Sequence, residues 1–178
     1  MKPLKPVDLE TLHARDCSLE RYLQAQDHAA GAEIRRKDTR QGTTQYDRAL
    51  QELTAGKKET HWMWFIFPQI KGLGTSPRDK TYSIKSLEEA KDYLAHPILG
   101  GRIRACAQAL LTLRGKNPQE IFEYSDDLKL RSCMTLFEIA ADEKENVFGK
   151  VIDQHYGGER DCRTVQILEA AKSARPVR

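Results

Sequence analysis

The chain has 178 residues, of which 39% are hydrophobic and 31% charged, with 29 Lys plus Arg against 26 Asp plus Glu. Because domains usually hold roughly 100 to 200 residues, this length predicts one domain around one core. The formal net charge of +3 lacks the concentrated basicity of a nucleic-acid-binding protein, and a mean hydropathy of −0.65 is too polar for a membrane protein. Composition therefore predicts a soluble globular domain and argues against nucleic acid as a partner.

The N-terminus and the cysteines predict a cytoplasmic protein. Pro6, Asp8 and Glu10 interrupt the apolar run that a secretory signal needs, and the longest apolar stretch, 62–67, is far shorter than the roughly 20 residues of a membrane-spanning helix. The four cysteines show no zinc-ligand spacing, and the five histidines never recur at i, i+4. We therefore expect reduced thiols, no metal, no cofactor and no membrane partner.

Helical periodicity and capping residues predict the elements of the first half of the chain. A first helix follows Ser18 over the pattern LERYLQAQD, and a second carries an apolar stripe over 46–53 and ends at Gly56. Between them, the basic segment 28–45 is expected to be a helix extension or a mobile loop. The aromatic run 62–67 is continuous rather than periodic, so it fits a buried strand or a buried helix equally well.

Further helices are expected in the second half. A capping box of Ser86 and Glu89 begins one helix, which ends near His96–Pro97, and a 3.6-residue period from Ile98 to Gly115 predicts the next. A short helix follows Asn117–Pro118, and a longer one, capped by Ser125 or Asp126, runs to Ala141. The last two are a helix at 147–156, stopped by Gly157–Gly158, and a helix capped by Asp161. The prediction is a mainly α-helical single domain at 18–172 with a basic insertion at 28–45, an N-terminal arm at 1–17 and a C-terminal tail at 173–178.

The first candidate site surrounds the aromatic run. His61 and Gln69 bracket Trp62 and Trp64, and such a group can stack a flat ligand and hold its polar edge. The alternative is that both tryptophans fill the core and that His61 is an ordinary surface residue.

The second candidate is the glycine-containing segment that follows. Gly72 and Gly74 expose backbone N–H groups, and the side chains of Lys71, Thr75, Ser76 and Arg78 are suited to ringing an anion. The segment matches neither the Walker pattern nor the dinucleotide fingerprint, so a polar turn after a buried segment is the alternative.

The third candidate is a polar ridge on the helix that begins near residue 126. Asp126, Lys129, Ser132 and Thr135 recur every third residue beside apolar neighbours, so Lys129 is placed to activate the Ser132 hydroxyl or a water. The order K-x-x-S is the reverse of the S-x-x-K of acyl-transfer enzymes. The alternative is a solvated helix face with an Asp126–Lys129 pair.

The fourth candidate is His96, which precedes Pro97 at a helix end. A histidine there interacts well with the helix dipole, so a structural role is sufficient. A functional role requires that His96 face the same pocket as Tyr82 and His61.

Several segments of the chain together resemble a known family. They are Ala25–Asp27, Tyr46, His61–Gln69, Gly72–Gly74, Tyr82, His96–Gly100, Asp127–Lys129 and Ser132–Phe137. Over roughly residues 18–168 the chain is similar to the uncharacterised bacterial and fungal family marked by HWMWFIFPQ, domain of unknown function family 1810, sometimes labelled calpastatin. The resemblance implies a mainly α-helical fold, and hence a helix at 62–67, but no activity, cofactor or substrate.

Two features of the chain differ from what the family and its label imply. Calpain inhibition of the calpastatin kind belongs to disordered repeats, and this chain is compact and unrepeated. Family members also connect the first helix to the tyrosine matching Tyr46 by a few residues, so 28–45 is an insertion here, expected to cover a pocket or extend a helix.

The leading hypothesis is one concave site for a nucleotide or sugar-nucleotide derivative, with metal-free hydrolysis as the reaction class. The expected ligand-binding residues are Trp62, Trp64, Gln69, Gly72, Gly74, Tyr82 and His96. The expected catalytic residues are His61, Asp127, Lys129 and Ser132, with Asp127 or His61 as general base and Lys129 stabilising charge. The competing hypothesis is a protein-interaction module without catalytic activity, and the oligomeric state is left open.

Overall fold

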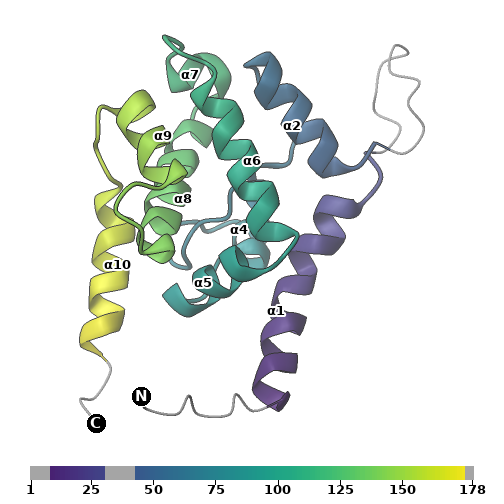
Figure 1. Ribbon diagram of the computed structural model, residues 1–178, viewed down its shortest axis with the longest axis vertical. Helices are drawn as coiled ribbons and strands as arrows, with labels where there is room; N and C mark the ends of the chain where they lie inside the picture. Colours follow the sequence, from purple (N-terminus) through teal and green to yellow (C-terminus); the bar gives the residue numbers. More distant parts are fainter. Residues whose placement is uncertain (1–8, 31–42, 175–178) are drawn as a thin grey trace.

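The computed structural model describes residues 9–30 and 43–174, with side chains described from Ser18 onward. Within these ranges the chain forms ten helices and no strand, so the mainly α-helical prediction is confirmed (Figure 1). The helices are α1 (Leu9–Asp27), α2 (Gln45–Ala55), α3 (Met63–Ile66), α4 (Pro77–Tyr82), α5 (Leu87–Ala95), α6 (Leu99–Leu111), α7 (Pro118–Ile121), α8 (Asp126–Ala141), α9 (Val147–Tyr156) and α10 (Cys162–Ser173).

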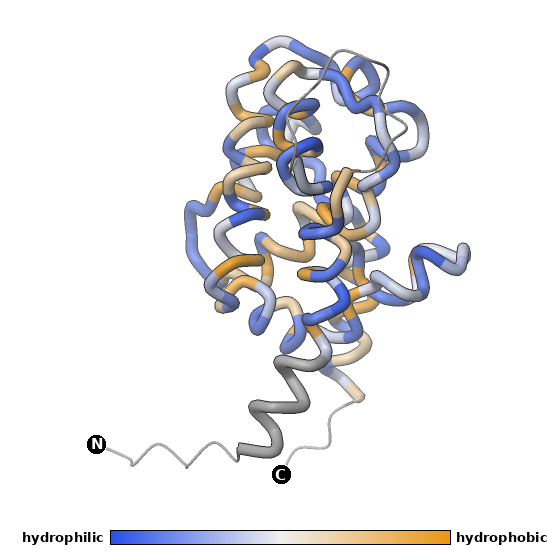
Figure 2. Tube along the Cα trace, turned by 90° about the vertical axis from the view of Figure 1, so that its right-hand side faces the viewer, coloured by the Kyte–Doolittle hydropathy of each residue, from blue (hydrophilic) through white to orange (hydrophobic). Residues whose placement is uncertain are grey.

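Helix α8 lies at the centre of the fold. It packs against α5, α7, α9 and α10. Helix α6 in turn packs against α2, α5 and α9 (Figure 1). Figure 2 shows hydrophobic and hydrophilic stretches alternating along the helices, as one buried face per helix requires. None of the described helices has the length and apolar character needed to cross a bilayer.

Aromatic side chains fill much of the core. Trp62, Phe67 and Phe122 are buried and meet edge to face, with ring centroids 6.1 to 6.4 Å apart. A second group links Tyr93 to Phe137 at 5.2 Å, so α5 is joined to α8. Such edge-to-face pairs stabilise a core beyond the area they bury, and they fix the short helix α3 against α7.

Most predicted helix ends are confirmed by their caps. Gly56 adopts φ 74° after α2, and the Asn117 side chain caps α7 with Pro118 in its first turn. Asp161 accepts from the Thr164 N–H at the start of α10. The aromatic run is a helix, as the family resemblance implied: α3 is a single turn that follows Trp62.

Other boundaries differ from the prediction. Helix α1 begins at Leu9, inside the segment expected to be an arm, and Ser18 donates to Glu89 instead of capping a helix. Glu89 makes only half of the expected capping box, because its carboxylate accepts from Ser18, Arg21 and the Lys85 N–H. Helix α4 was not predicted.

The basic insertion falls largely outside the described residues, at 31–42. Its two ends lie side by side, because Ala29 and Thr44 form an antiparallel bridge and the Gln45 N–H donates to the His28 carbonyl at 2.9 Å. The two ends of the insertion, at residues 28–29 and 44–45, therefore lie next to each other.

Candidate functional site

Two buried polar side chains hold the aromatic turn α3 in place. The Gln26 amide donates to the Phe65 carbonyl at 2.9 Å and to the Tyr93 hydroxyl at 3.1 Å. The Glu52 carboxylate accepts from the Trp62 indole N–H at 2.7 Å. Because Trp62 and Phe65 are held from opposite ends, the Trp64 side chain between them is left half-buried at the surface.

Glu52 also organises the loop that leads into α3. Besides the indole, its carboxylate accepts from the backbone N–H groups of Glu59 and Thr60, at 2.8 and 3.0 Å, and from the Thr60 hydroxyl at 2.7 Å. A buried carboxylate with four donors is fully satisfied. The Glu52 side chain therefore determines where residues 59–62 run.

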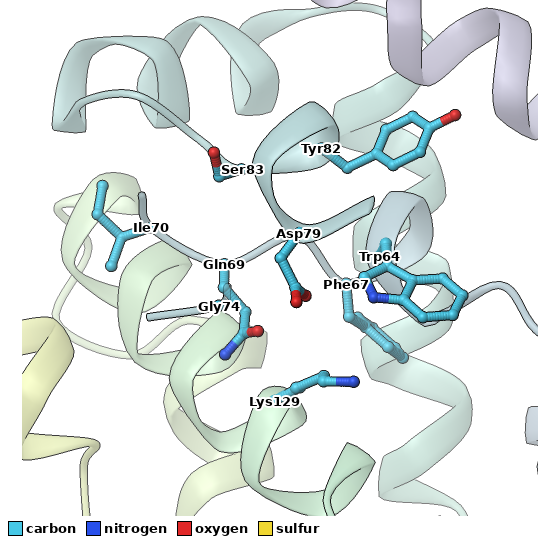
Figure 3. Close-up of a pocket in the computed structure, with 9 residues that line it drawn as sticks. All are labelled: Trp64, Phe67, Gln69, Ile70, Gly74, Asp79, Tyr82, Ser83 and Lys129. Atoms are coloured by element: carbon cyan, nitrogen blue, oxygen red, sulfur yellow. The ribbon is translucent and has the colours of Figure 1, made fainter. Parts of the chain in front are cut away.

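The Trp64 side chain borders a small cavity between α3, α4 and α8, which we call the Trp64 cavity (Figure 3). The enclosed space has a volume of about 10 Å³, which is room for about one water molecule, and the open space at the mouth brings the volume to about 280 Å³. Because ligand pockets typically enclose roughly 300 to 1,000 Å³, a ring-sized group can lie only at the mouth of this cavity, against the half-buried Trp64 side chain. The lining residues are Trp64, Phe67, Gln69, Ile70, Gly74, Asp79, Tyr82, Ser83 and Lys129.

Polar groups from three segments converge on this cavity. Figure 3 shows the Asp79 carboxylate pointing into the centre, the Lys129 ammonium reaching in from α8, and the Gln69 amide to one side of them. The Lys129 nitrogen lies 5.4 Å from the centroid of the Trp64 ring, and the exposed Arg78 guanidinium lies 4.8 Å from it. The cations beside Trp64 and the Asp79 carboxylate together give the cavity both positive and negative groups around one aromatic face.

An ion-pair network fixes Lys129. Its ammonium and that of Lys58 each lie 2.9 Å from the Asp126 carboxylate. Burial raises the pKa of Asp126, but hydrogen bonds from Lys129 and Lys58 outweigh this effect and lower the pKa below its ordinary value. The carboxylate is therefore charged at neutral pH and shared between two ammonium groups, and it holds Lys129 at the mouth of the cavity.

Five of the residues predicted from the sequence line the Trp64 cavity: Trp64, Gln69, Gly74, Tyr82 and Lys129. Ser132 lies directly behind it, where its hydroxyl accepts from the Gln69 amide and also lies close to the carbonyls of Leu128 and Lys129. Ser132 is 2% exposed, and no hydrogen bond joins it to the Lys129 ammonium. Its observed role is to orient Gln69.

The other predicted residues lie elsewhere. Trp62 is completely buried between Phe67 and Phe122, so neither of its faces is open to a ligand. Asp127 is buried beside Gln119, whose amide donates to it at 3.3 Å, and does not line the cavity. The position of Trp62 favours the alternative that this tryptophan fills the core.

Both histidines and Gly72 also lie outside the cavity. His96 Nδ1 accepts from the backbone N–H groups of Ile98 and Leu99, each at 3.2 Å, and so satisfies the start of α6. His61 is exposed and lines neighbouring hollows. Gly72 adopts φ 107° in an exposed turn, which is the reason for a glycine there.

The glycine-containing segment forms a helix cap. Ser76 and Asp79 make a complete capping box at the start of α4, in which each side chain accepts from the other residue's backbone N–H at 3.1 Å. A Cβ at Gly74 would lie 2.3 Å from Asp79 Cγ, so only glycine fits. The Ser76 hydroxyl and N–H are thus already paired, which leaves the predicted anion ring incomplete.

Sequence reasoning missed Asp79, Ser83, Phe67 and Ile70 as lining residues. The pattern Ser76-Pro77-Arg78-Asp79 is itself a capping-box signal with proline in the first turn, and it predicts α4. It was available in the sequence, whereas the approach of α4 to Lys129 depends on tertiary packing.

The comparisons with known proteins agree with this architecture. The family model described as "Protein of unknown function (DUF1810)" matches residues 16–168. The chain belongs to this family. The crystal structure of the conserved hypothetical protein Rv1873 from Mycobacterium tuberculosis is similar to it, with 41% identity and a TM-score of 0.73, over 85% of this chain and 96% of that chain. No curated protein matches the chain. The DUF1810 match includes every residue of the Trp64 cavity.

Proposed function

We propose that this DUF1810 chain binds a small molecule with a planar ring and a negatively charged group, of the nucleotide or sugar-nucleotide class, at the Trp64 cavity. The observation that carries the proposal is the convergence of Trp64, Gln69, Asp79 and Lys129 from separate segments on one hollow. A stacking surface with a few polar groups at its edge is the usual composition of a ligand site.

The two cations beside Trp64 define how such a ligand would enter. Arg78 is exposed, so an incoming ring can displace its guanidinium from the indole at little cost. Gln69 is oriented by Ser132 and offers an amide to a ring edge. Lys129, held by Asp126, faces the same space and complements a negative charge on the ligand.

Metal-free hydrolysis is the reaction class that these residues suit, with roles revised by the geometry. Asp79 replaces Asp127 and His61 as the proposed general base, because its carboxylate points into the cavity (Figure 3). Lys129 keeps the proposed role of stabilising developing negative charge. Product analysis of bound nucleotides by mass spectrometry, with Asp79→Asn as the inactive variant, tests this part separately from binding.

A thermal-shift panel of nucleotides, ADP-ribose derivatives, sugar phosphates and amino acids tests the binding proposal. A ligand at 100 times its Kd stabilises a protein by about 2.7 kcal/mol, which is a readily measured shift. We expect one chemical class to raise the melting temperature of the wild type and not of Trp64→Leu, with Lys150→Met, an exposed lysine of α9, as a variant that retains the response. Silence across the panel would favour the interaction-module hypothesis.

A further inference from the structure

A second hollow adjoins the Trp64 cavity and shares Lys129 with it. Its volume, open space included, is about 1500 Å³, and Lys57, Lys58 and Arg48 line it together with Lys129. We call it the Arg48 hollow. It is large enough for the part of a ligand that extends beyond the mouth of the Trp64 cavity.

Arg48 in the wall of this hollow is a largely buried cation with unmade hydrogen bonds. Its side chain is 14% exposed, and its Nε and Nη2 atoms are buried without a hydrogen-bond partner among the residues that the structure describes. The nearest carboxylate oxygen, Glu52 Oε1, lies 4.0 Å from Nη1. Buried polar groups of native proteins are nearly always paired, so such a guanidinium calls for an explanation.

Arg48 forms only a long ion pair with Glu52, at 4.0 Å, because the loop before α3 engages the Glu52 carboxylate. Both carboxylate oxygens of Glu52 already accept from Glu59, Thr60 and Trp62 at 2.7 to 3.0 Å. The acidic group closest to Arg48 is therefore engaged by other donors. A guanidinium is a planar fork of donors without acceptors, and its natural complement is an oxyanion.

The remaining charges of the hollow also favour an anion. Asp126 is shared by the ammonium groups of Lys58 and Lys129, so these three side chains together carry one net positive charge. Lys57, Glu59 and Glu123 also border the hollow, and because all three are exposed, water and salt screen their charges alike. The less exposed side chains therefore set the balance of charge in the hollow, and that balance is positive.

We propose that the Arg48 hollow binds the phosphate group of the ligand whose ring stacks on Trp64. The inference rests on the proposed function and narrows its ligand to a phosphate ester. A phosphate carries several acceptor oxygens, which match donors arriving from Arg48, Lys57 and Lys58. Lys129 borders both sites, so a ligand whose ring stacks on Trp64 reaches the Arg48 hollow by passing Lys129.

Calorimetric titration with inorganic pyrophosphate tests the phosphate site. We expect saturable binding to the wild type, at least tenfold weaker binding to Arg48→Met and partial recovery in Arg48→Lys. The matched control is Arg163→Met, an exposed arginine of α10 that should leave the affinity unchanged. Equal pyrophosphate affinity in wild type and Arg48→Met, or no binding to the wild type, would overturn the assignment.

The melting temperature without any phosphate separates a binding role from a structural one. If the role of Arg48 is to bind an anion, Arg48→Met removes a largely buried charge with unmade hydrogen bonds. The melting temperature of this variant is then equal to or higher than that of the wild type. A lowered melting temperature with unchanged pyrophosphate affinity would instead make Arg48 a structural residue.

Adenosine, a ring without phosphate, distinguishes failure of this inference from failure of the proposed function. Its binding is followed by Trp64 fluorescence, with Trp64→Leu as the blank. If adenosine binds and pyrophosphate does not, the phosphate site is wrong while the proposed function stands. If pyrophosphate binds and adenosine does not, the two groups do not belong to one ligand, and both the ring site and this inference fail.

Discussion

Trp62 and Trp64, two residues apart, have different tasks at the scale of single residues. Trp62 is completely buried and donates to Glu52, so it anchors the loop before α3. Trp64 is half-buried and contacts the cations of Arg78 and Lys129. The buried indole fixes the backbone, and the half-buried indole is thereby presented to the cavity.

Replacing Glu52 tests this anchoring. Glu52→Gln keeps the size of the side chain but loses the charge that strengthens its four hydrogen bonds, so we expect the free energy of unfolding to fall by about 2 kcal/mol. Urea unfolding measures the change, with the exposed Glu145→Gln as the matched control. An unchanged midpoint would show that the loop is held by other contacts.

The Asp126 network predicts a pH-dependent contribution to stability. Because the pKa of Asp126 is lowered in the folded state, its contribution is present above the unfolded pKa near 4 and is lost as the pH falls through the folded pKa. We expect Asp126→Asn to reduce stability at pH 7 by about 1 kcal/mol. Unfolding curves across pH 2 to 7 should show this difference vanish in acid, and a constant difference would contradict the assignment.

At the scale of elements, α5 and α6 meet where α6 begins. A Cβ at Gly100 would lie 2.1 Å from the Leu94 carbonyl oxygen, whereas one at Gly101 would meet nothing within 4 Å. Gly100 is buried and Gly101 is exposed. The close approach of α6 to the end of α5 therefore requires glycine at position 100 and leaves room for a side chain at position 101.

The two glycines provide a matched pair of substitutions. Gly100→Ala should lower the free energy of unfolding by about 2 kcal/mol, because the methyl group forces the backbones apart. Gly101→Ala should raise it by about 0.5 kcal/mol, because alanine favours the helix. Thermal unfolding of both variants measures the contrast, and equal effects would mean that the crossing of α5 and α6 is wrong.

The sequence predicts helices well where local signals are strong. Gly56 acts through its own backbone conformation, whereas Asn117 and Asp161 cap helices through side chains that accept from backbone N–H groups two or three residues on. The ends of α2, α7 and α10 therefore follow from local chemistry. The aromatic run 62–67 has no such signal of its own. It is held by hydrogen bonds with Glu52 and Gln26, which lie 10 and 39 residues away from their partners in the run.

At the scale of the whole molecule, only part of the candidate site can be predicted from the sequence. The meeting of Trp64 with Lys129 requires α3 and α8 to pack near each other, and nothing in either segment encodes the other. Asp127 and Lys129 lie two residues apart on α8, yet they face different surroundings because a helix turns by about 100° per residue. Tertiary packing thus selects which polar residues form the cavity.

The burial of the cysteines tests the packing of the whole domain. Burial raises the pKa of the Cys106 thiol to about 12 and that of Cys133 well above its ordinary value, whereas Cys162 is exposed. Because the thiolate is the reactive form, iodoacetamide at pH 8 should label Cys162 in the native protein and spare the two buried thiols. Peptide mass spectrometry, with urea-unfolded protein as the control, checks this pattern. Equal labelling of Cys106 and Cys162 in the native state would contradict it.

The two indole N–H signals in a ¹H–¹⁵N correlation spectrum provide the most direct test of the central claim. The signal missing in Trp64→Phe identifies Trp64, and the protein is then titrated with AMP, ADP and UDP-glucose. We expect at least one of these ligands to shift the Trp64 indole signal saturably and to leave the signal of Trp62, whose indole N–H donates to Glu52, in place. If the Trp64 signal stays unmoved by all three, the cavity does not bind this class of ligand.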